Sequence, residues 1–188
     1  MHRPDPREPA GDRPSDEAFR RAFRVLHGPT LHGFALLLTL GDRRRAAALV
    51  SDALDAADGH ADGLRHPERA AAWLRSRVTS SIGRREASLG ARDRLSVLEE
   101  LGVTDAVLAG LAALGTLERA ALITSWIERL DSRDVATVVG RTGNRLDSLL
   151  QRARRRYLDG HAAAPQAAET ADGPLAAVVR ASAARAMA

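Results

Sequence analysis

The sequence has no cysteine, no lysine and few aromatic residues. Without cysteine, disulfide bonds and thiolate metal sites are excluded, which fits a reducing compartment. Aromatic residues make up only 3% of the 188, so a core must be built mostly from Ala, Leu and Val, a composition that favours helices over sheets. The best apolar run, Phe34 to Leu40, is far short of the roughly 20 residues that span a bilayer. Met1 to Pro14 also lacks the apolar stretch of a secretory signal, so we expect a cytoplasmic protein.

Because lysine is absent, all 28 basic residues are arginines, and the formal net charge is +4. Every cation is therefore a planar guanidinium, a shape that matches phosphate oxygens and guanine edges. The Ala-rich, lysine-free composition is also typical of a GC-rich genome, and codon bias alone would produce it.

Two groups of amphipathic helical patterns are separated by a charged, glycine-containing stretch. We therefore predict an all-α fold with two small helical domains, a four-helix domain and a helix-turn-helix domain, joined by a linker. In the first domain we place a helix break at Gly28 and Pro29, and we expect Phe19, Phe23 and Leu26 to face inward. The predicted divisions are a disordered lead over 1–14, helical domains over 15–85 and 104–158, a linker over 86–103 and an Ala-rich tail over 159–188.

The strongest local signal runs from Asp131 to Arg156 and indicates a helix-turn-helix. Ala136 provides a small residue midway along the first helix, Gly140 a turn, and Leu146 with Leu149 or Leu150 an apolar inner face. Asp131 and Thr142 are the expected N-caps. Residues 141–156 hold six arginines and one acid, Asp147. This balance favours DNA binding over the alternative, a solvated amphipathic helix on a plain bundle.

The predicted DNA contacts divide along the second helix of this motif. Its N-terminal end meets base edges, and its later arginines meet the phosphate backbone. The DNA-binding residues that we predict are Arg141, Asn144, Arg145, Ser148, Arg152, Arg154 and Arg155.

Two stretches carry short motifs in a fixed order. The C-terminal one has LAAL at 111–114, ERAAL at 118–122, Gly140 and RARR at 152–155. The N-terminal one has LVSDA at 49–53, PER at 67–69 and AWL at 72–74. In order and spacing these motifs resemble the extracytoplasmic-function sigma factors of bacterial RNA polymerase. The resemblance covers about residues 18–85 and 108–158, and it implies the same two-domain helical fold.

The resemblance implies that the N-terminal domain binds the clamp of core RNA polymerase and the C-terminal domain reads an upstream promoter element. Leu49, Val50 and Asp52 would then belong to the polymerase-binding helix. Asp147 and Leu149 stand where the family commonly has basic residues, so the promoter sequence cannot be deduced.

Three functions follow: an initiation factor that works with core RNA polymerase on promoter DNA, a stand-alone helix-turn-helix regulator, and an interaction module that sequesters an anti-sigma factor. The sequence has no phosphate-binding loop, catalytic triad or cysteine nucleophile, so we expect no enzyme activity and no cofactor. Asp58, His60, Asp62 and His66 lie in a predicted loop that we interpret as a solvated turn, with no metal site. We expect Trp73 and Trp126 to pack in the core.

Overall fold

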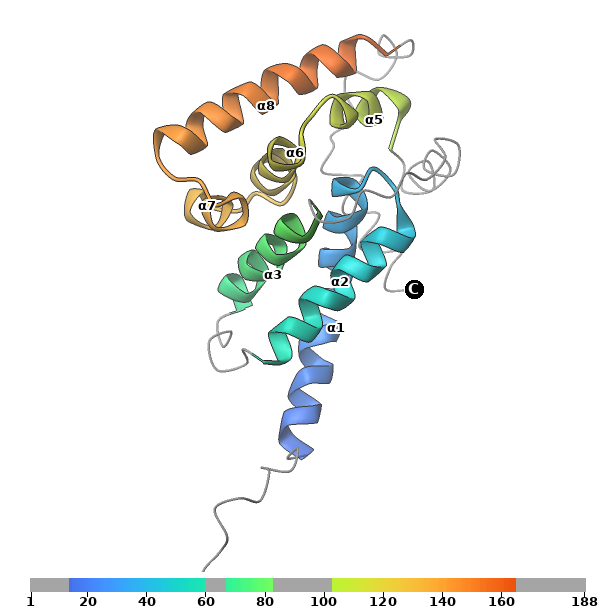
Figure 1. Ribbon diagram of the computed structural model, residues 1–188, viewed down its shortest axis with the longest axis vertical. Helices are drawn as coiled ribbons and strands as arrows, with labels where there is room; N and C mark the ends of the chain where they lie inside the picture. Colours follow the sequence, from blue (N-terminus) through green and yellow to red (C-terminus); the bar gives the residue numbers. More distant parts are fainter. Residues whose placement is uncertain (1–13, 60–66, 83–102, 165–188) are drawn as a thin grey trace, which may run out of the picture.

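A computed structural model describes residues 14–59, 67–82 and 103–164, and it confirms an all-α fold, with no strand in these ranges (Figure 1). None of the helices described is long and apolar enough to cross a bilayer. The predicted lead and linker, all but their last residues, and most of the tail lie outside the described residues. The elements are α1 Pro14–Leu38, α2 Arg43–Asp58, α3 Pro67–Ile82, α5 Asp105–Ala112, α6 Thr116–Leu122, the π-helical turn η2 Ile123–Ile127, α7 Ser132–Val139 and α8 Asn144–Ala162.

The predicted break at Gly28 and Pro29 is wrong, because α1 continues through both residues to Leu38. Proline usually disfavours a helical residue before it, through contact with that residue's Cβ. Gly28 has no Cβ, so this part of the clash is missing. The buried residues Phe23, His27 and Leu31 also follow one another at intervals of four, so one apolar stripe spans the proline.

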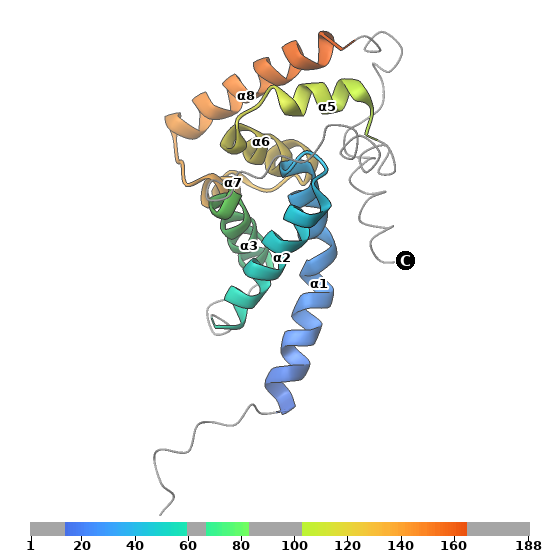
Figure 2. The same cartoon turned by 45° about the vertical axis from the view of Figure 1, so that its right-hand side comes forward.

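The inward face predicted for this helix is also only partly correct. Phe23 is buried, but Phe19 is 47% exposed and Leu26 is 61% exposed. The start of α1 projects beyond α2 and α3 in both views (Figures 1 and 2). Arg24 already contacts α2, so Leu26 is exposed because it lies off the sector of α1 that carries the buried stripe.

Helices α5 and α8 cross at very short range, through two glycines. A Cβ at Gly110 would lie 2.6 Å from Cε2 of Tyr157, and a Cβ at Gly160 would lie 2.7 Å from the Cβ of Ala113. Helix α8 ends at Ala162, later than predicted, because its last turns complete this crossing. Burial raises the pKa of Tyr157 to about 12, so its phenol stays neutral at physiological pH.

The N-terminal and C-terminal helices share one continuous hydrophobic core, and α3 packs directly on α7 (Figure 1). A buried ion pair lies across this contact: Nε and Nη2 of Arg75 each donate to a carboxylate oxygen of Glu128 at 2.6 Å. The two side chains are only 7% and 10% exposed. Arg75 also lies over the ring of Phe34, and together with burial its charge lowers the pKa of His27.

A second buried arginine, Arg119, also joins the two halves, but it belongs to the C-terminal helices and bonds to an N-terminal one. Arg119 of α6 donates from Nη1 to the carbonyl oxygen of Leu38, at the end of α1, at 2.6 Å. Its Nε and Nη2 donate to the carbonyl oxygens of Leu111 and Leu114, at 2.9 and 2.8 Å. Helix ends leave such carbonyls without partners, and a cation there is favourable. Burial lowers the pKa of Arg119 to about 10, which still leaves it charged at neutral pH.

Helix α6 passes directly into the π-helical turn η2. The N–H of Glu128 bonds to the carbonyl oxygen of Ile123, five residues back, at 3.0 Å. The hydroxyls of Thr124 and Ser125 donate to the carbonyl oxygens four residues before them, which competes with the ordinary helical bonds. Arg129 then takes a left-handed conformation with φ +54°.

We predict that Gly110→Ala lowers the free energy of unfolding by about 1–3 kcal/mol, because the methyl group overpacks against Tyr157. In an open helix the same change would stabilise by about 0.5–1 kcal/mol. Gly59→Ala is the matched control, since the nearest atom to its Cβ lies at 3.8 Å. Urea unfolding followed by circular dichroism measures both. A Gly110→Ala midpoint at or above that of the unchanged protein would contradict the tight crossing.

We predict that Glu128→Ala lowers the free energy of unfolding by about 3–5 kcal/mol, because it leaves the Arg75 charge buried without a partner. Glu17→Ala is the control, since the Glu17–Arg21 pair is largely exposed and should matter little. Equal, small shifts in the thermal midpoint for both variants would show that the buried pair does not hold α3 and the C-terminal helices together.

Candidate nucleic-acid interface

Helices α7 and α8 are joined by a short turn over residues 140–143. The carboxylate of Asp131 accepts from the backbone N–H of Asp134 at 2.8 Å, which confirms the predicted cap. Gly140 ends α7 in the left-handed conformation with φ +63°, a position that glycine adopts without strain. The second predicted cap is wrong, because α8 begins after Gly143, with φ +52°, and not after Thr142.

One face of α8 is buried, and none of the helices in the described ranges lies against the opposite face. Leu146 and Leu149 are buried as predicted, and Leu150 is partly buried. Ala153 and Tyr157 continue the inner face towards α5. In both views α8 lies at the outer edge of the molecule, with α5 and α6 between it and the N-terminal helices (Figures 1 and 2). Its outer face is therefore open along its length.

The outer face carries three of the predicted DNA-binding residues. Asn144, Ser148 and Arg155 are exposed and lie within one sector of the helix, as their spacing of four and seven residues requires. Arg145 is also exposed, on the flank that faces α6. Arg141 is exposed in the turn, where its Nη1 donates to the carbonyl oxygen of Gly140 at 3.1 Å.

Arg152 and Arg156 occupy the flank of α8 that faces α6, and both contact Glu118. Nε of Arg152 donates to Oε1 of Glu118 at 3.0 Å, and Nη1 of Arg156 donates to Oε2 at 2.7 Å. The Glu118 side chain is 9% exposed, and each arginine side chain is about half exposed. Glu118 also accepts from the N–H of Gly115 at 3.1 Å, so its side chain caps the start of its own helix α6.

Arg154 lies on the other flank of α8, over the ring of Trp126 at 5.3 Å from the centroid. Trp126 is 41% exposed, so the prediction that it packs in the core is wrong. The π-helical turn places it at the surface beside α8. Trp73 is partly buried and packs against the core, as predicted.

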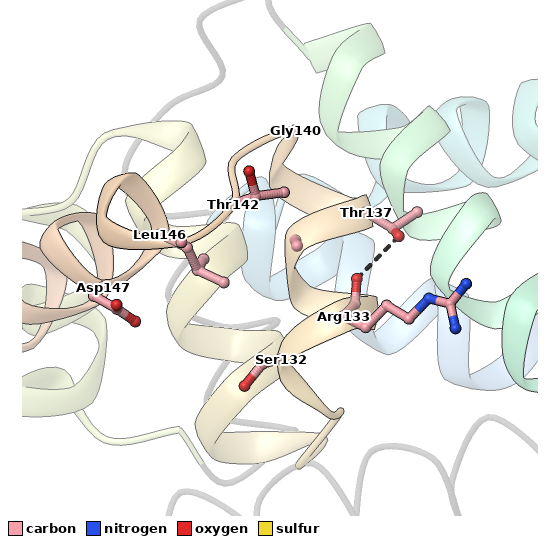
Figure 3. A pocket seen from close by; sticks show the side chains of 9 residues that line it. Ser132, Arg133, Thr137, Gly140, Thr142, Leu146 and Asp147 are labelled. Atoms are coloured by element: carbon pink, nitrogen blue, oxygen red, sulfur yellow. Dashed lines mark hydrogen bonds between the residues drawn. The ribbon is translucent and has the colours of Figure 1, made fainter.

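A hollow of about 560 Å³ lies between α7 and the first turn of α8 (Figure 3). Arg133 lies on its α7 side and Asp147 on its α8 side, and the remaining lining residues are uncharged. The Thr137 hydroxyl donates to the carbonyl oxygen of Arg133 at 3.0 Å. Of the residues on the α7 side, the sequence indicates Ala136 and Gly140 for the helix crossing and the turn, but no charge pattern marks Arg133 or Thr137.

On α2, only one of the three residues predicted to bind polymerase is accessible. Leu49 and Val50 are core residues, and Asp52 is exposed. Asp55 follows Asp52 by about one turn of α2, and Arg24 of α1 donates to it at 2.7 Å. This hydrogen bond lowers the pKa of the Asp55 carboxyl. Arg24 also contacts Asp58, the one described residue of the predicted solvated turn, at 2.7 Å.

Comparison with family models, curated proteins and solved structures finds no match. The chemistry of the surface must therefore be inferred from its residues. An exposed helix face with amide, hydroxyl and guanidinium groups can bond to base edges and phosphates.

Proposed function

We propose that this chain is a sigma-type initiation factor of the cytoplasm, in which α7 and α8 form a helix-turn-helix that reads promoter DNA. The observation that carries the proposal is the open outer face of α8, with Asn144, Ser148 and Arg155 on one sector and Leu146 and Leu149 on the buried one. A helix that rests on its apolar side and offers polar readers to solvent can enter a major groove.

We predict that Arg155→Ala weakens binding to all duplexes similarly and reduces the salt slope by about one unit, because one phosphate contact is lost. Arg145→Ala should instead relax sequence preference, with a cost of about 1–3 kcal/mol at one base pair. The measurement is a salt-titrated binding series with the full chain, on a duplex selected from a random library and on its scrambled form.

Arg21→Ala is the matched control for this series. It removes the same charge from the projecting part of α1, far from α8, and should leave the salt slope unchanged (Figure 1). If all three variants bind alike, with the same slope, then α8 does not touch DNA. The alternative in which the chain sequesters an anti-sigma factor would then be the better one.

The polymerase part of the proposal depends on α2. Its exposed face carries Asp52 and Asp55, while Leu49 and Val50 fix its inner face in the core. The resemblance to the sigma family supports the same assignment, since LVSDA belongs to its polymerase-binding helix. Leu49 and Val50 would then position the helix, and Asp52 would make the contact.

We predict that Asp52→Arg reduces co-purification with core RNA polymerase at least tenfold without changing the thermal midpoint. The reason is that reversing an exposed charge opposes a complementary surface but disturbs no packing. Asp159→Arg, on an exposed acid near the end of α8, is the control. Undiminished co-purification of Asp52→Arg would favour the stand-alone regulator, which binds duplex DNA unaided.

A further inference from the structure

We propose that Glu118 restrains non-specific DNA binding by holding Arg152 and Arg156 away from the phosphate backbone. The inference rests on the proposed DNA-binding role of α8 and assigns a specificity function to a residue of α6. Among the arginines of residues 141–156, these two are the ones paired to a carboxylate in the described structure.

The geometry allows Glu118 to form charge-assisted hydrogen bonds with both arginines at once. Each of its carboxylate oxygens accepts from a different guanidinium, at 3.0 and 2.7 Å. The Glu118 side chain is 9% exposed and each arginine about half exposed, so solvent reaches these contacts only from the arginine side. The N–H of Gly115 and the first turn of α6 further stabilise its negative charge.

A phosphate must therefore compete with a contact that already exists. If Arg152 or Arg156 turns to DNA, Glu118 loses a charge-assisted hydrogen bond in a buried position. Arg145 and Arg155 have no such competitor, because within the described residues neither has an ion-pair partner. The arginines of α8 thus divide into a restrained pair and an available pair.

The restrained pair matters most for sequences that the protein should not bind. Non-specific binding is almost entirely electrostatic and grows with the number of phosphates that are neutralised. Base-edge contacts by residues at the start of α8 do not depend on the restrained pair. Withholding two cations therefore lowers affinity for scrambled DNA more than affinity for the selected site, which raises the ratio between them.

The test is Glu118→Gln, in which the amide oxygen can still accept from the N–H of Gly115 and preserve this bond at the start of α6. With the full chain, we expect affinity for a scrambled duplex to rise by about tenfold and the salt slope to rise by about one to two units. Affinity for the selected duplex should rise less, so the specificity ratio falls. Arg152→Gln and Arg156→Gln added to this variant should reverse both changes.

Two control variants distinguish the release of paired arginines from a simple change in net charge. Asp159→Asn removes an equal charge from α8 without freeing a paired arginine, so it should change the slope much less. Arg156→Gln alone should leave the slope unchanged, in contrast to Arg155→Ala, and it reports on the restraint even if Glu118→Gln unfolds. If Arg155→Ala lowers the slope but Glu118→Gln leaves scrambled-duplex affinity the same or lower, the restraint is overturned. If the unchanged protein binds no duplex, the proposed function fails and the restraint fails with it.

Discussion

The guanidinium of Arg119 closes the ends of two helices from opposite halves of the chain, and the placement of α8 depends on it. Its three carbonyl partners come from α1, from the last turn of α5 and from the corner before α6. Helix α8 rests on α5 and α6, so Arg119 helps to fix the orientation of its outer face relative to α1, together with the shared hydrophobic core. Arg75 of α3 and Glu128 provide a second connection. Arg75 belongs to the N-terminal helices and bonds to the C-terminal ones, whereas Arg119 belongs to the C-terminal helices and bonds to α1.

Neighbouring residues of α6 therefore have different tasks. Arg119 points into the core and joins the halves, while Glu118 reaches outward to the arginines of α8. The six arginines of residues 141–156 are chemically identical, but their surroundings separate them. One pair is held by a carboxylate, Arg154 lies on an aromatic ring, Arg141 bonds to the carbonyl oxygen of Gly140, and Arg145 and Arg155 are exposed without an ion-pair partner among the described residues. Net charge alone would count all six equally.

Periodicity and turn chemistry predicted most helices, the Asp131 cap and the turn at Gly140, because these features are local. The continuous α1 differs from the prediction because a proline usually ends a helix. Here the residue before it is Gly28, which has no Cβ, and one buried stripe crosses both residues. The partners of the arginines lie beyond local patterns: Glu118 is 34 and 38 residues from Arg152 and Arg156, and Glu128 is 53 residues from Arg75. Trp126 was misplaced because its outward direction is set by the π-helical turn, which no hydrophobic spacing reveals.

That π-helical turn changes the direction in which the side chains after it point. It holds one residue more than an ordinary helical turn, and the extra residue rotates everything after it by about 100° relative to α6. Trp126 consequently meets α8, while Glu128, two residues later, meets α3. Removing one residue from the turn would change the composition little but would rotate Glu128 and the residues after it away from their partners. The length of this segment is thus as strict a requirement as the identity of its residues, and a homologue with one residue fewer here would need a different pair of contacts between its halves.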